Sequence, residues 1–155
     1  MWHEICTEKD ICFLMETVGY FHDSCLKELK YVSGAYVNAD LSMHPINDMR
    51  ELKMIIQRQD ESPSAIELVF SGLNYCKLFP CNEQFTCEIL DATLLWKGGN
   101  ILWADCGDLR AEEVEKYSGT IISAAGLRWR AGCGGERSVN GLGAGKCMVK
   151  GKFPQ

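Results

Sequence analysis

Apolar residues near the start of the chain recur at intervals of three and four, at Ile11, Leu14, Met15 and Val18. This spacing places one apolar stripe along a helix. Thr7 suits the N-cap position with Asp10 three residues later, and Gly19 suits the end of a helix. The pattern therefore predicts a helix between Thr7 and Gly19, with a stripe that a sheet or another helix must cover.

From Ser24 onward, apolar and polar side chains alternate as they do in strands with one buried face. We expect extended chain over residues 24–37, 51–59 and 65–80. The inward positions of the last two segments are Leu52, Met54, Ile56, Ile66, Leu68 and Phe70. Residues 39–50 are polar and contain a proline, which predicts a loop.

Residues 87–106 give the clearest signal for a hairpin. Two β-rich runs are separated by Gly-Gly-Asn at 98–100, residue types that tolerate positive φ. Residues 107–119 predict a short helix or an irregular loop. Residues 120–130 predict a last strand, with Leu127 and Trp129 facing inward.

These elements predict an α+β fold, mainly an antiparallel β-sheet packed against an N-terminal helix. A chain of 155 residues is long enough for one domain, which we place at residues 1–131. Residues 132–155 contain seven glycines and no apolar period, which predicts a flexible Gly/Lys-rich tail. The segment GLGAGKCM within it is no phosphate-binding loop, because Cys147 stands where that motif needs Ser or Thr.

The net charge is −5, with a pI near 5.2. An acidic chain is poorly suited to neutralise phosphates, so we expect no nucleic-acid partner and favour a basic protein. No apolar run has the length of a membrane span, and the first residues do not resemble a signal peptide. We therefore expect a cytoplasmic protein with no membrane contact.

Nine cysteines occur at irregular spacings, with no C-x-x-C pair. In a chain without an export signal, reduced cysteines that pack as small apolar residues are the better interpretation. The three histidines stand in separate segments without metal-ligand spacing, so we expect no metal and no cofactor.

The stretch YFHDSCLKEL places His22, Asp23 and Cys25 within four positions. Side chains three apart in an extended chain point to opposite faces, so His22 is poorly placed to activate the thiol of Cys25. Asp23 suits a turn, where its carboxylate accepts backbone N–H groups. We expect structural roles and keep a small active site or ligand site at these three residues as the alternative.

An acidic cluster near the end of the hairpin is the candidate binding surface. Its members, with a tryptophan that could anchor a partner, are Asp105, Asp108, Glu112, Glu113, Glu115 and Trp103. Such a cluster can steer a basic partner, although runs of charge are often only solvated surface.

The strings FHDSCLKEL, AIELVFSGLNYCKL and EILDATLLWKGGNILWAD resemble a layout found in small bacterial proteins. That layout has an F-H-D-[SA] turn into a strand, an I-x-L-x-F-x-G-[LV] strand pair and a closing hairpin. Most such families are uncharacterised, and several are associated with immunity proteins of polymorphic toxins. The resemblance covers residues 2–130 and implies a compact antiparallel sheet without catalytic residues.

We therefore expect a non-catalytic, immunity-type binding protein whose partner is a basic protein such as a toxin. The alternative is a small enzyme or ligand-binding protein that uses His22, Asp23 and Cys25. The oligomeric state is left open.

Overall fold

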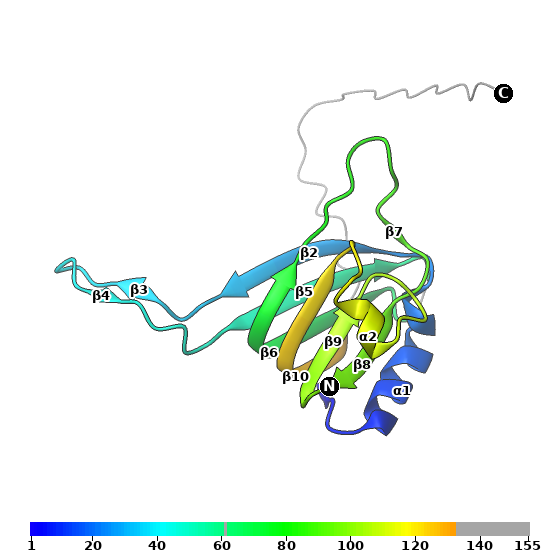
Figure 1. The fold of residues 1–155 in the computed structure, drawn as a ribbon, viewed down its shortest axis with the longest axis horizontal. Helices are drawn as coiled ribbons and strands as arrows, with labels where there is room; N and C mark the ends of the chain where they lie inside the picture. The colour runs from blue at the N-terminus through cyan, green and yellow to red at the C-terminus, as the bar shows by residue number, and fades with distance from the viewer. Residues whose placement is uncertain (61, 133–155) are drawn as a thin grey trace.

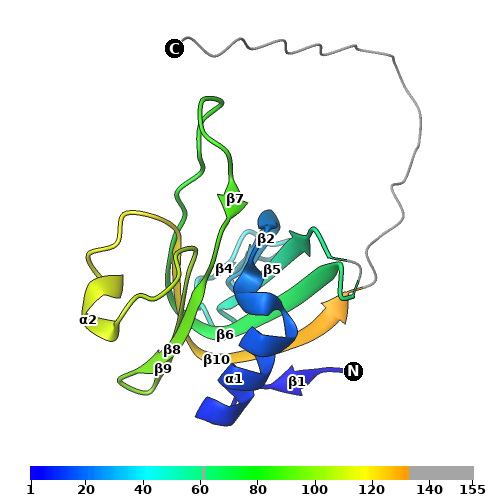
Figure 2. The same ribbon diagram turned by 90° about the vertical axis from the view of Figure 1, so that its right-hand side faces the viewer.

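A single curled antiparallel sheet, with helix α1 on its concave side, forms the body of the protein (Figures 1 and 2). The structure is a computed structural model and describes residues 1–60 and 62–132. The helices are α1 (Glu8–Thr17), the 3-10 turn η1 (Gly19–Phe21) and α2 (Ala111–Val114). The strands are β1 (His3–Glu4), β2 (Ser24–Val32), β3 (Tyr36–Val37), β4 (Met43–His44), β5 (Glu51–Arg58), β6 (Ala65–Lys77), β7 (Glu88–Ile89), β8 (Thr93–Lys97), β9 (Asn100–Ala104) and β10 (Ile121–Gly132). The expected α+β class is confirmed.

The sheet runs in the order β7-β2-β5-β6-β10-β9-β8, and β1 pairs with the far half of β10. Neighbouring strands are antiparallel throughout. The predicted β8–β9 hairpin turns at Gly98 and Gly99, whose φ values are +58° and +79°. Both lie in the left-handed region that the Gly-Gly pair was expected to supply.

The alternation predicted for the central strands is confirmed. Leu52, Met54 and Ile56 of β5 are buried, as are their counterparts Ile66, Leu68 and Phe70 of β6. The inward residues of β10, Leu127 and Trp129, join the same core. The intervening side chains of β5 are only partly buried. The strands therefore carry their apolar side chains on the concave face, where α1 covers them.

Helix α1 begins as predicted with a capping box. The Thr7 hydroxyl accepts the Asp10 N–H at 3.3 Å, and the Asp10 carboxylate accepts the Thr7 N–H at 2.7 Å. The helix buries Ile11, Leu14 and Met15. Beyond Val18 the chain turns sharply, because Gly19, Tyr20 and Phe21 all take positive φ. This turn directs the chain from the helix into β2.

The prediction of a loop over residues 39–50 is wrong in part, because Met43 and His44 form β4. They pair with β3 to make a small hairpin closed by hydrogen bonds between Asn38 and Ser42. Strands of two residues are too short to show an alternation in the sequence. We call residues 33–50 the arm, which extends away from the sheet (Figure 1).

Gly132, the first residue of the predicted tail, belongs to β10. The remainder of the predicted tail, residues 133–155, lies outside the described residues. Residues 107–119 contain the short helix α2, one of the two predicted possibilities. Within the described ranges, no helix has the length and apolar character needed to span a bilayer.

Candidate functional site

His22 joins two distant parts of the chain at the corner between η1 and β2. Its Nδ1–H donates to the carbonyl oxygen of Leu90, just before β8. Its Nε2 lies 3.4 Å from an Asp23 carboxylate oxygen, and its Nδ1 lies 3.8 Å from Asp91. The imidazole therefore ties the start of β2 to the segment between β7 and β8.

This environment favours the protonated imidazole. The hydrogen bond to Leu90 raises the pKa of His22 above its usual value of 6.5, and the charges of Asp23, Asp91 and Glu88 raise it further. A raised folded-state pKa means that His22 stabilises the fold fully below pH 6.5. That contribution declines as the pH rises through the folded-state pKa.

We expect an NMR titration of His22 to give a midpoint above 6.5. Asp23→Asn should lower this midpoint, because it removes the charge closest to Nε2. Asp40→Asn is the matched control, since Asp40 lies in the arm and should leave the midpoint unchanged. A midpoint at or below 6.5, or equal effects of the two substitutions, would contradict this assignment.

Asp23 and Cys25 line a cavity of about 660 Å³ at the ends of β2, β5 and β7, together with Gln57 and Glu88. His22 is not among the residues that line it. No hydrogen bond or ion pair joins Cys25 to His22 or Asp23 in the described part of the chain. The structure therefore brings two of the three predicted alternative residues to one cavity and directs the imidazole to a backbone carbonyl.

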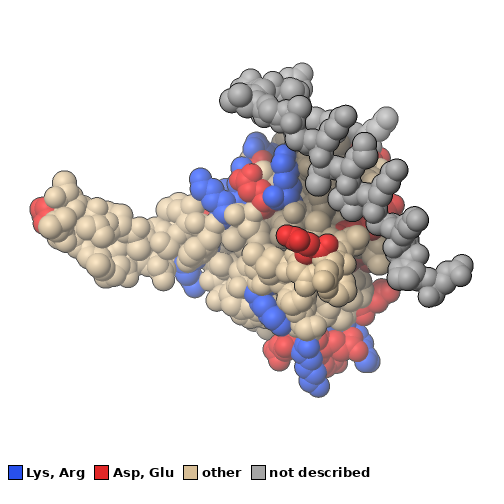
Figure 3. All heavy atoms as spheres, turned by 90° about the horizontal axis from the view of Figure 1, so that it is seen from above, with Lys and Arg blue, Asp and Glu red and all other residues tan. Residues whose placement is uncertain are grey.

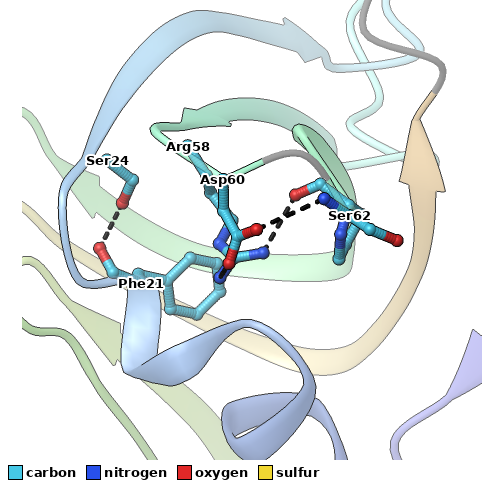
Figure 4. A network of polar contacts seen from close by, with 6 residues as sticks. Phe21, Ser24, Arg58, Asp60 and Ser62 are labelled. Atoms are coloured by element: carbon cyan, nitrogen blue, oxygen red, sulfur yellow. Dashed lines mark hydrogen bonds and ion pairs between the residues drawn. The ribbon is translucent and has the colours of Figure 1, made fainter.

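Arg58, which also lines this cavity, was not singled out from the sequence. Its side chain is only 6% exposed and pairs with Asp60 at 3.2 Å. It also donates to the Pro63 carbonyl at 2.9 Å, while Ser24 donates to the Phe21 carbonyl nearby (Figure 4). These contacts fasten the β5–β6 turn, which gives Arg58 a structural role.

Three carboxylates of the predicted acidic cluster form hydrogen bonds or ion pairs with neighbouring residues. Asp105 accepts the Tyr117 hydroxyl at 2.8 Å and the Thr120 N–H at 3.0 Å. Burial and this contact with Asp105 raise the pKa of the Tyr117 hydroxyl. Glu113 pairs with Arg110 at 3.0 Å, and Glu115 with Lys97 at 2.6 Å.

Asp108 and Glu112 are exposed and enter no ion pair within the described ranges. Glu113 and Glu115 also remain exposed, at 43% and 67%, so the role of this cluster as a binding surface stays a prediction.

The suggestion that Trp103 anchors a partner is wrong. Trp103 is completely buried on the inner side of β9, opposite Leu94 and Ile122. Its ring makes an edge-to-face contact with Phe21 at a centroid distance of 6.2 Å. Both faces of β9 are buried: Ile101 and Trp103 point into the core that α1 covers, whereas Leu102 and Ala104 join a second apolar cluster.

Among the described residues, the arm gathers the largest group of exposed, large apolar side chains. Six large apolar side chains are 52–84% exposed: Tyr36, Val37, Leu41, Met43, Ile46 and Met49. On the face seen in Figure 3, hardly any charge interrupts this surface. Scattered exposed apolar residues are ordinary, but a contiguous group of this size marks an interaction site.

Contacts within the arm hold its shape. The rings of Tyr36 and His44 stack at 4.7 Å, and His44 lies 3.6 Å from Asp48. At the base, the Met49 N–H donates to the Ser33 carbonyl at 3.1 Å. Gly34 has a φ of +95°, and a Cβ there would collide with the Asp48 carboxylate. The base of the arm therefore requires glycine at this position.

No protein-family model, curated protein or solved structure matches this chain. In the part of the chain that the structure describes, no group of His, Cys, Asp and Glu side chains is arranged to hold a metal ion. Over residues 1–60 and 62–132, the arm is the segment with the most exposed large apolar side chains.

Proposed function

We propose that this protein is a non-catalytic, cytoplasmic protein-binding domain of the immunity type, and that the arm inserts into an apolar groove of a basic partner such as a toxin. The supporting observation is the exposure of all six large apolar side chains of the arm. An isolated two-stranded hairpin is marginally stable in water, so a partner that covers both faces would stabilise it.

The size of the arm suits a specific interface. Six large side chains that are each more than half exposed offer on the order of 600 Å² of surface, close to the ~800 Å² that one partner buries in a standard complex. A β-ribbon that enters a groove is covered from both sides. The apolar surface of both strands therefore contributes to binding.

The charges of the arm favour a basic rim around that groove. The arm carries Asp40 in its tip turn and Asp48 near its base, and its one Lys or Arg, Arg50, is its last residue, which leaves the arm with one net negative charge. The Ser42 hydroxyl and N–H both donate to Asp40, which lowers the pKa of this carboxyl and keeps it ionised. Two carboxylates beside an apolar surface complement Lys or Arg at the rim of a groove and raise the association rate.

The test is co-expression with the product of the adjacent reading frame, followed by measurement of the dissociation constant. We expect Leu41→Asn to weaken the complex about tenfold or more, because Leu41 is 84% exposed and asparagine would bury much less apolar surface against the partner. Leu90→Asn is the matched control. Leu90 is also exposed, at 63%, but lies outside the arm and should leave affinity unchanged.

If Leu41→Asn and Leu90→Asn changed the dissociation constant equally, the arm would not be part of the interface. Light scattering of the isolated protein tests whether the arm instead binds a second copy of this chain. A dimer that Leu41→Asn converts to a monomer would show that the arm binds a second copy of this chain and would contradict the proposed heterologous partner.

The alternative function, a small enzyme or ligand-binding protein at His22, Asp23 and Cys25, has less support. The cavity holds the carboxylate and the thiol, but the imidazole that would act as the base donates to Leu90 instead. A nucleophilic thiol needs a base within hydrogen-bond reach.

A further inference from the structure

Two methionines stand among the exposed apolar side chains of the arm. Met43 of β4 is 68% exposed, and Met49, near the base of the arm, is 52% exposed. Met15 of α1 and Met54 of β5 are instead buried in the core. A reagent in solution can therefore reach the two thioethers of the arm, whereas the core shields the other two.

A thioether is the one apolar side-chain group that a mild oxidant makes polar. With a hydroperoxide, the sulfur lone pair attacks one peroxide oxygen, and an S–O bond forms as the O–O bond breaks. The leaving hydroxide takes the proton of the transferred oxygen and becomes water. The sulfur loses two electrons and the peroxide gains them. The product, methionine sulfoxide, is polar, and sulfoxide reductases return it to the thioether.

The positions of Met43 and Met49 make this change one of surface and not of fold. Met43 pairs with Val37 across the β3–β4 hairpin, and both side chains are exposed. Met49 is fastened through its backbone, because its N–H donates to the Ser33 carbonyl at 3.1 Å. Oxidation of the side chains leaves these backbone contacts in place. It puts a polar oxygen on a surface whose burial in an apolar groove then costs free energy.

We propose that Met43 and Met49 are the sites of a hydroperoxide-sensitive switch: conversion of both to sulfoxides releases the partner from the arm, and reduction restores binding. This inference rests on the proposed function, because the released partner is the one that the arm binds. It adds the regulation of that interface and the chemical class of the reagent that acts on it.

The oxidation step is tested on the isolated protein. The full chain is treated with hydrogen peroxide and then with dithiothreitol, which returns disulfides and sulfenic acids of cysteine to thiols but leaves sulfoxides unchanged. Mass spectrometry of its peptides should show Met43 and Met49 oxidised about tenfold faster than Met15 and Met54. Equal rates at the arm and core methionines would overturn the assignment of these sites.

The release step is tested with the partner from the co-expression experiment. Peroxide treatment should weaken the complex about tenfold or more, because two apolar side chains become polar. The double substitution Met43→Leu and Met49→Leu keeps the volume and apolar character of both positions. This variant should bind as tightly as the unsubstituted protein, and peroxide should not weaken it. It retains Met1, which is exposed outside the arm and serves as the internal control.

The outcomes separate the switch from the proposed function. Unchanged affinity of the oxidised protein would overturn the switch while the binding role of the arm stands. An equal loss of affinity in the double variant would also overturn it, because the effect would then arise from Met1 or from cysteine oxidation. If Leu41→Asn leaves the affinity of the unoxidised protein unchanged, the proposed function fails, and the switch fails with it.

Discussion

Ile56→Ala is expected to lower the free energy of unfolding by about 2–5 kcal/mol. Ile56 is completely buried on the concave face of β5, opposite Leu26 and Ile66. Removing most of its side chain leaves a cavity that the neighbouring strands can fill only in part. Urea denaturation followed by circular dichroism measures this change.

Ile55 provides a control that differs only in the face it occupies. It is adjacent in the chain and partly exposed, because it points to the opposite side of β5. Ile55→Ala should therefore cost less than about 1 kcal/mol. A reversed order of the two effects would mean that the register of β5 is shifted by one residue.

Glu67→Gln is expected to lower the free energy of unfolding by about 1–3 kcal/mol. The Glu67 side chain is 12% exposed on the outer side of β6. It accepts Lys53 at 2.6 Å and the Arg130 guanidinium at 2.6 and 2.7 Å. Glutamine keeps the shape but removes the charge that these two cations compensate. Glu51→Gln is the control, because Glu51 makes one longer contact, 3.6 Å from Arg128.

The cost of Glu67→Gln should depend on pH. Burial alone would raise the pKa of Glu67, but the hydrogen bonds and charges of Lys53 and Arg130 hold it below its usual value of 4.5. The stabilisation is therefore complete above pH 4.5 and is lost as the pH falls through the folded-state pKa. Urea denaturation measures the difference in free energy of unfolding between the unsubstituted protein and Glu67→Gln. A difference that stays constant down to pH 3 would argue against this ion-pair network.

The elements with the strongest local signals could be predicted from the sequence. The Thr7–Asp10 pair placed the start of α1, Gly98 and Gly99 placed the β8–β9 turn, and the alternation along β5 and β6 gave their buried faces. In each case a few neighbouring residues determine the backbone conformation. The curl of the sheet and the pairing of β1 with β10 depend on contacts between distant segments, which local patterns do not contain.

The site was less predictable because side-chain roles depend on these long-range contacts. The contact of His22 with Leu90 joins residues 68 positions apart. The sequence predicted Asp105 as a surface acid, whereas its carboxylate accepts hydrogen bonds from Tyr117 and Thr120. The face of β9 that carries Trp103 could not be predicted from alternation, because residues 101–104 are all apolar and are buried on both faces of the sheet. The arm could have been suspected from the apolar residues within residues 39–50, which an ordinary solvated loop does not need.

Strand β2 has one long unpaired side. Among the described residues, β7 pairs only with Ser24 and Cys25, which leaves the backbone from Leu26 to Val32 without a neighbour on that side. Open strand borders are templates for polymerisation, and charged side chains, lysine above all, oppose it. Lys27, Glu28 and Lys30 are exposed along this border. We therefore expect these charges to oppose amyloid-like stacking of β2 on other chains. Replacing Lys27 and Lys30 with neutral residues should promote aggregation before it lowers the free energy of unfolding.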